Sequence, residues 1–320
     1  MEGTRGFQQR YDELIKEYRT LQVNYSEQAK LYSRKIIKTG WIRVLLFVLL
    51  IALPLYFYHT SIYLSLLGFF VIATGFVVVI KKFNHYKNLK EENRHLQNLN
   101  QNEVSAINGD WDCFCSGKKF IDPFHNYSHD LDLFGEGSFY QYINRCATIE
   151  GESVLWQKLA NAKPDIDSIR KNQKLFQELS QKLSFRQSFY AKGKCMDEQE
   201  SDLENLRDLE SYSPWLKNKG IAFRFLVKLL PFLFIISLVI SIMGYLQELP
   251  VLLFIVNLNV LGLNFRTLTK LNNRFSVLSG MLKKYSVLTD LVAKQRFVSD
   301  GLVDLSDRLV SKESNASVAI

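Results

Sequence analysis

The sequence is poor in the residues that build disulfide frameworks, metal sites and phosphate-binding loops. It has four cysteines in 320 residues, and the Cys113-x-Cys115 pair has neither the spacing nor the second pair of a zinc site. It contains no Gly-x-x-x-x-Gly-Lys-Ser/Thr run, so this chain is not expected to hydrolyse ATP by itself. A cleavable signal peptide is not recognisable either, because polar residues precede the first apolar run. No catalytic, cofactor-binding or metal-ligating residue is therefore proposed.

What the chain does have is apolar blocks set among polar helices. Hydrophobic residues make up 47% of the sequence, which excludes a disordered tail. Their concentration in very apolar blocks among strongly polar helices is the composition of a membrane protein with large soluble parts. The net charge of +8 is concentrated beside these blocks, for example at Arg34 and Lys38 before the first and at Lys81 and Lys82 after the second. This location favours membrane topology over nucleic-acid binding as the reason for the excess.

The first two apolar runs, Trp41 to Tyr58 and Ile62 to Ile80, are close to the ~20 residues that a membrane-spanning helix needs. A turn of three residues joins them, so they are expected to form a transmembrane hairpin. Basic residues flank its outer ends and none lies in the turn. The positive-inside rule then places the N-terminus and the residues after Ile80 in the cytoplasm, with the chain in the inner (cytoplasmic) membrane. A buried hairpin in a soluble protein is the alternative.

A second hairpin is expected from Ile221 to Leu246 and Val251 to Phe265, which would make the protein multi-pass. Asn257, Asn259 and Asn264 lie in its second run, where we expect them to form hydrogen bonds between helices. A small transporter is an alternative interpretation of these polar residues, but no ionisable side chain lies in the middle of either run.

Polar helices are expected next to both hairpins. Residues Phe7 to Tyr32 carry an apolar seam with heptad spacing, and the helix from Lys82 to Ile107 should pack against it as an antiparallel coiled coil. A long helix should follow Arg266, with a similar seam. The members of the first seam are Phe7, Tyr11, Leu14, Tyr18, Leu21, Tyr25 and Tyr32.

The segment from Asp122 to Arg145 lacks this plain periodicity and contains turn and capping signals. Gly135 and Gly137 are expected to adopt positive φ, and Ser138 and Thr148 to cap helices. A short extended ribbon is expected from Trp111 to Pro123, one amphipathic helix from Asp167 to Tyr190, and an acidic helix from Asp197 to Leu209. His125 and His129 are interpreted as solvent-facing or capping residues.

The run Asp-Leu-Asp-Leu-Phe-Gly-Glu-Gly-Ser, followed by a helix ending in Asn-Arg, resembles the start of the core domain of the MutS family of DNA mismatch repair ATPases. The similarity covers roughly Phe120 to Leu209 and, more loosely, Leu271 to Ile320. The chain departs from the family at Ile149-Glu150, where Pro and an apolar residue are typical. No mismatch-reading domain precedes the core. The matching residues, interpreted as a structural hub, are Asp130, Asp132, Gly135, Gly137, Ser138, Asn144, Arg145, Thr148 and Gly151.

The resemblance implies a core and lever region, binding of mismatched DNA, and an ATPase domain that would follow Ile320 and bind ATP and Mg²⁺. The partners expected are the lipid bilayer, a second copy in a homodimer and DNA. The alternative function is a membrane scaffold or signalling protein that uses a MutS-type ATPase switch without DNA.

The expected fold is an all-α membrane protein with six parts: an amphipathic helix (1–40), hairpin 1 (41–80), a returning helix (81–110), the MutS core-like domain (111–215), hairpin 2 in place of the clamp (216–265) and a lever-like helix (266–320).

Overall fold

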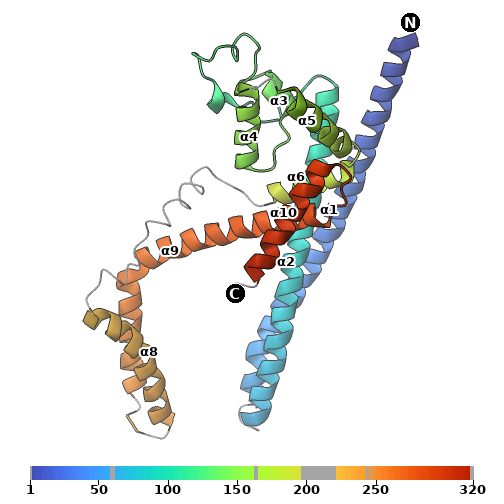
Figure 1. The fold of residues 1–320 in the computed structure, drawn as a ribbon. Helices are drawn as coiled ribbons and strands as arrows, with labels where there is room; N and C mark the ends of the chain where they lie inside the picture. Colours follow the sequence, from blue (N-terminus) through green and yellow to red (C-terminus); the bar gives the residue numbers. More distant parts are fainter. Residues whose placement is uncertain are drawn as a thin grey trace. The chain divides into compact units, whose positions relative to one another are not determined.

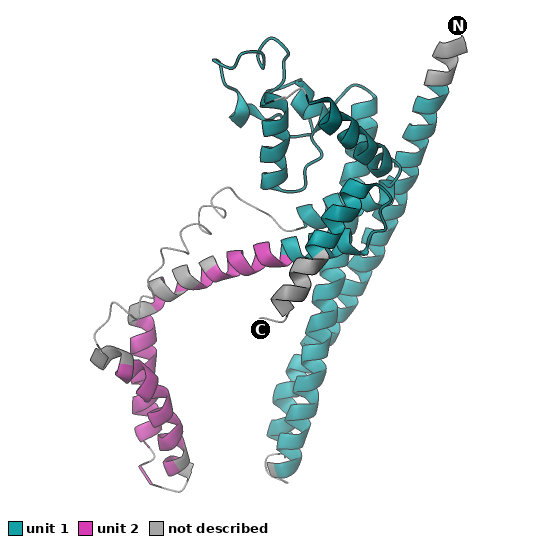
Figure 2. Ribbon diagram, viewed as in Figure 1, with its two compact units in different colours: residues 1–197, 284–320 teal, residues 198–283 magenta. Residues whose placement is uncertain are grey.

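The computed structural model describes residues 2–57, 62–161, 165–195, 221–242, 245–246 and 248–317. Within these ranges the regular elements are all helices, and no strand is present. The chain separates into two compact units, residues 1–197 with 284–320 and residues 198–283 (Figure 2). The α-helices are α1 (Glu2–Phe57), α2 (Ile62–Ile107), α3 (Phe139–Ile143), α4 (Ile149–Ala160), α5 (Ile166–Ser180), α6 (Leu183–Lys194), α8 (Ile221–Ile242), α9 (Leu249–Lys294) and α10 (Asp300–Ser317).

Helices α1 and α2 lie side by side along most of their length (Figure 1). The rings of Tyr32 and Tyr86 stack with centroids 6.3 Å apart, and near the turn the Ser65 hydroxyl donates to the Pro54 carbonyl over 3.0 Å. The antiparallel packing expected of these two helices is therefore present. Tyr11 and Leu14 of the expected seam are nevertheless exposed, so the seam is not buried at this end of α1. Counted from the stacked tyrosines, the last residue of α2, Ile107, lies near the level of Tyr11.

The α1–α2 hairpin carries an apolar surface on its outside. Both helices are long and apolar enough to cross a membrane, and no residue of their apolar windows is buried. Trp41, for example, is 72% exposed and Val48 is 54% exposed. This differs from the core helix of a soluble protein, whose apolar side chains are mostly buried.

The second unit contains α8 and the larger part of α9. The rings of Phe234 and Phe254 lie 6.1 Å apart across the two helices. Their apolar segments, Val227–Leu238 and Leu249–Gly262, are shorter than the ~20 residues that a span needs. The Asn257 and Asn259 side chains each donate to the carbonyl one turn back in α9, at 2.9 Å in both cases. Hydrogen bonds from these asparagines to another helix stay a prediction. Nothing is described of the Asn264 side chain.

Three expected elements differ from the structure. The segment from Trp111 to Pro123 is not a ribbon but a series of turns with a 3₁₀-helix at Lys118–Phe120. The single helix expected from Asp167 to Tyr190 is two helices, because α5 ends where the Gln181 N–H turns back to the carbonyls of Glu178 and Leu179. The lever-like helix is likewise divided between α9 and α10. The acidic helix expected over 197–209 lies outside the described residues.

Candidate functional site

The entry to the hub is a pair of glycine turns. Gly135 and Gly137 adopt φ of 111° and 73°, as expected, and these conformations are open chiefly to glycine. The Gly135 N–H donates to the Ser116 carbonyl over 2.9 Å. The turns therefore hold this segment against the irregular chain that follows α2.

Helix α3 begins with a reciprocal cap. The Ser138 hydroxyl accepts from the Gln141 N–H over 3.2 Å, which confirms the expected N-cap. The Gln141 side-chain oxygen accepts from the Gly137 N–H over 2.7 Å. The Ser-x-x-Gln spacing is the sequence signal of a capping box; here the glutamine accepts from the residue before the N-cap and not from the N-cap itself. Gln141 also donates to the Phe114 carbonyl over 3.0 Å, so one amide side chain joins α3 to the segment before it.

The two aspartates of the motif act at different places. Asp132 has a φ of 45°, uncommon for a non-glycine residue but tolerated by aspartate, and its carbonyl accepts from the Phe139 N–H over 3.1 Å. Asp130 is exposed. Among the described residues, no group of three or more His, Cys, Asp or Glu side chains is placed to hold a metal ion.

His125 caps the end of α4. Its Nε2 lies 2.9 Å from the Ala160 carbonyl, and its Nδ1 accepts from the Ser128 N–H over 3.2 Å, an arrangement that requires a neutral ring protonated at Nε2. The Tyr127 hydroxyl donates to the same carbonyl over 2.7 Å. The capping interpretation of His125 is therefore confirmed, and this residue is engaged in structure.

Thr148 and Asn144 fix the start of α4. The Thr148 hydroxyl accepts from the Gly151 N–H over 3.0 Å, which confirms the expected N-cap. Asn144 is buried; it donates to the Cys115 carbonyl over 3.3 Å and accepts from the Cys146 N–H over 3.0 Å. Burial raises the pKa of the Cys146 thiol to about 11, so this cysteine is a poor nucleophile near neutral pH.

Arg145 fastens the hub to α2. Its guanidinium forms a two-pronged ion pair with Glu103, with N–O distances of 2.6 and 3.1 Å, and it lies 3.3 Å from the centroid of the Phe114 ring. It also donates to the Tyr142 and Asn144 carbonyls. Both charged side chains are partly buried, where a fork-shaped pair is stronger and more directional than a surface pair. The sequence singled out Arg145 but not Glu103.

Helix α6 packs on α2 and on the hub through small and polar groups. The Asn100 and Gln187 amides form a buried reciprocal pair, at 2.8 and 3.4 Å. A Cβ added at Gly193 would lie 2.5 Å from the Ala147 Cβ, so only glycine allows this approach. The sequence does not predict the Asn100–Gln187 pair. Each amide is an isolated polar residue in a helical pattern, and the two lie 87 residues apart.

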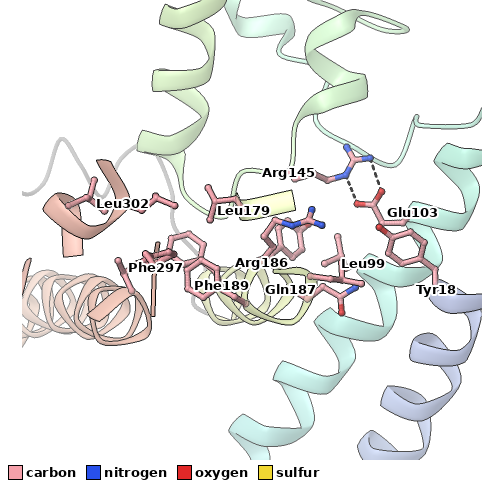
Figure 3. Close-up of a pocket in the computed structure, with 15 residues that line it drawn as sticks. Tyr18, Leu99, Glu103, Arg145, Leu179, Arg186, Gln187, Phe189, Phe297 and Leu302 are labelled. Carbon is pink, nitrogen blue, oxygen red and sulfur yellow. Dashed lines mark hydrogen bonds and ion pairs between the residues drawn. The ribbon is translucent and has the colours of Figure 1, made fainter. Parts of the chain in front are cut away.

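A cavity of about 350 Å³ lies between α1, α2, α5, α6, the end of α9 and α10. Figure 3 shows its polar wall, with the Glu103–Arg145 pair beside Tyr18 and Arg186, opposite apolar side chains. Burial raises the pKa values of the Tyr18 and Tyr190 hydroxyls, so both remain neutral donors. The apolar lining comprises Leu99, Leu179, Leu183, Phe185, Phe189, Val292, Phe297, Leu302 and Leu305.

Glu178 of α5 binds the chain just before α10. Its carboxylate accepts from the N–H groups of Val298 and Ser299, at 2.9 and 2.7 Å, which a helix N-terminus favours. Hydrogen bonding from Ser299 and Val298 lowers the pKa of Glu178 to about 2. Lys182 adds a bond to the Arg296 carbonyl over 2.8 Å. The turn between α9 and α10 is thus tied to α5.

The structure brings most of the nine hub residues into one local framework, between residues 130 and 151, while the Asp130 side chain is exposed. Their role as a structural hub stays a prediction. Comparison of the chain with family models, with curated proteins and with solved structures gives no match.

Proposed function

We propose that the chain is the membrane-anchored core and lever portion of a MutS-like ATPase. In this proposal the α1–α2 hairpin crosses the inner membrane, and α8 with the first part of α9 forms a second membrane hairpin in place of the DNA clamp. The N-terminus and the remaining residues lie in the cytoplasm. The ATP and Mg²⁺ sites belong to a domain that would follow Ile320.

The observation that carries the proposal is the continuity of two helices. α1 and α2 run without interruption for 56 and 46 residues, and each contains both an apolar segment and a polar segment in the unit that holds the hub. Continuous backbone hydrogen bonds therefore join the two segments without an intervening loop. A lever that begins in the membrane needs this property.

The orientation can be tested with the native cysteines. Cys113 and Cys115 are exposed, and we expect a membrane-impermeant maleimide to label them only after the cells are permeabilised. Because burial raises the pKa of the Cys113 thiol, labelling should be performed at mildly alkaline pH. His59→Cys, between α1 and α2 in the sequence, should add labelling in intact spheroplasts. Labelling of the wild type in intact spheroplasts would contradict the proposed topology.

DNA binding is the part of the proposal that rests on the resemblance alone. The detergent-solubilised chain should be titrated with matched and mismatched duplexes over a salt series. Tighter binding to the mismatch, with affinity that falls steeply as salt rises, is the result expected for a repair protein. Absence of binding at low salt would rule out this role and favour the alternative, a membrane scaffold with a MutS-type switch, which the location of basic residues beside the apolar runs also supports.

A further inference from the structure

The positive charge of this chain comes from one stretch. Residues 28–90 contain nine Lys and Arg residues and no Asp or Glu. The remaining 31 Lys and Arg residues are set against 32 Asp and Glu residues, so the rest of the chain has a formal net charge of −1. The nine basic residues, which we call the basic collar, are Lys30, Arg34, Lys35, Lys38, Arg43, Lys81, Lys82, Lys87 and Lys90.

The hairpin brings the two halves of the collar to one level. Lys35 of α1 lies 5.3 Å from the ring centroid of Tyr32 and 5.5 Å from that of Tyr86, on α2. Arg43 of α1 lies 4.7 Å from the ring centroid of Phe83, also on α2. Residues 30–43 span about 20 Å along the helix axis, and antiparallel packing sets the α2 lysines beside them. All members except Arg43 and Lys90 are exposed.

The collar ends where the exposed apolar surface begins. Trp41 and Ile42 are exposed beside Arg43 on α1, and Val77 and Val78 are exposed just before Lys81 on α2. A cationic band without carboxylates attracts anions strongly, because no internal ion pair competes for its charges. An aromatic residue at the boundary between apolar and charged surface is typical of the bilayer interface.

We propose that the basic collar binds the headgroups of anionic phospholipids and so selects anionic lipid around the hairpin. This proposal rests on the proposed membrane anchoring and adds the class of lipid that surrounds the anchor. The phosphates of DNA carry the same charge, but a duplex bound here would have to lie against the apolar surface next to the collar. A phospholipid can contact both surfaces at once, since its phosphate and its acyl chains belong to one molecule.

The test uses the full chain reconstituted in phosphatidylcholine vesicles that contain a trace of spin-labelled lipid. Electron paramagnetic resonance then gives the fraction of labelled lipid that the protein immobilises. We expect phosphatidylglycerol to be preferred over phosphatidylcholine by roughly fivefold, the effect of about one basic residue per headgroup. Salt at about 1 M, where the Debye length is about 3 Å, should remove most of this preference.

Two quadruple variants with the same charge change separate the collar from net charge. The collar variant is Lys38→Gln, Lys81→Gln, Lys82→Gln and Lys87→Gln; the control variant is Lys16→Gln, Lys158→Gln, Lys171→Gln and Lys174→Gln, and all eight residues are exposed. The preference should fall below about twofold in the collar variant and persist in the control. Circular dichroism should show equal helicity in both.

The outcomes distinguish the inference from the proposed function on which it rests. A chain that inserts into neutral vesicles but treats the two labelled lipids alike overturns the lipid inference and leaves the anchoring intact. A chain that does not float with the vesicles overturns both. Loss of duplex binding in the collar variant without any lipid preference would assign the collar to nucleic acid and overturn the inference.

Discussion

The α1–α2 hairpin and the segment 111–161, which contains the nine hub residues and is called the hub below, are held together in different ways. In the hairpin, two long helices meet along a periodic seam with few polar contacts, as at Tyr32 and Tyr86. In the hub, short helices depend on individual caps, positive φ values and one ion pair, as at Thr148 and Arg145. Single substitutions should therefore act on different quantities: on membrane insertion in the hairpin and on folding in the hub.

The largest effect is expected from Gly117→Ala. Gly117 has a φ of 66°, and a Cβ there would lie 2.7 Å from the Tyr140 ring, so both strain and overlap should reduce the stability of the hub, by about 3 kcal/mol. Hydrogen exchange of amides in α3 and α4 measures it. Gly109→Ala is the control, because Gly109 has a φ of 92° with open space around it. Equal losses in the two variants would show that packing at Tyr140 does not matter.

A charge on the outside of the hairpin gives the next effect. Val48→Arg should disfavour insertion by about 3 kcal/mol if this face meets lipid, and flotation of the variant with vesicles measures the inserted fraction. Val154→Arg on α4 is matched to it, since the two valines are 54% and 48% exposed, and should insert like the wild type. If Val48→Arg is equally harmless, the hairpin does not cross the membrane.

Removal of the ion pair should lower the stability of the junction between the hub and α2. Arg145→Ala leaves Glu103 partly buried without its two-pronged partner, at a cost of about 2 kcal/mol. The same exchange measurement applies, now on α2 near Glu103. Lys118→Ala, which removes an exposed pair with Glu136, should change stability by less than about 0.5 kcal/mol. A cost for Lys118→Ala as large as that for Arg145→Ala would refute this account.

A smaller effect is expected at the start of α4. Thr148→Ala removes the acceptor of the Gly151 N–H and should cost about 1 kcal/mol, whereas Thr148→Ser keeps the hydroxyl and should cost little. Exchange of the first amides of α4 reports the difference. Identical rates in the two variants would mean that the cap does not stabilise this helix.

The most local effect concerns Glu178 and appears only in acid. Its pKa is lowered from 4.5 to about 2 in the folded chain, so its contribution to stability is complete above about pH 4.5 and is lost as the pH falls towards about 2. Exchange protection of the Val298 and Ser299 amides should decline over this range, and Glu178→Gln should abolish the decline. A decline of equal size in Glu178→Gln would assign it to another carboxylate.

Much of the hairpin could be predicted from sequence because periodicity and apolar length repeat over many residues. The caps at Ser138 and Thr148 were also predictable, since they follow from neighbouring residues. The Glu103–Arg145 and Asn100–Gln187 contacts were not, because their partners lie 42 and 87 residues apart and carry no local signal. The break at Gln181 was missed for the opposite reason: the apolar pattern continues across it, and only tertiary contacts of α5 and α6 distinguish two helices from one.

The unbroken course of α2 has a consequence for the space above the membrane. Lys81 at the edge of the apolar surface and Glu103 at the attachment of the hub are separated by 22 residues of one helix, or about 33 Å along its axis. If the hairpin crosses the bilayer as proposed, α2 acts as a fixed spacer that keeps the hub at this distance, along the helix, from the edge of the hydrocarbon core. A partner held between the hub and the membrane would then be selected by its thickness.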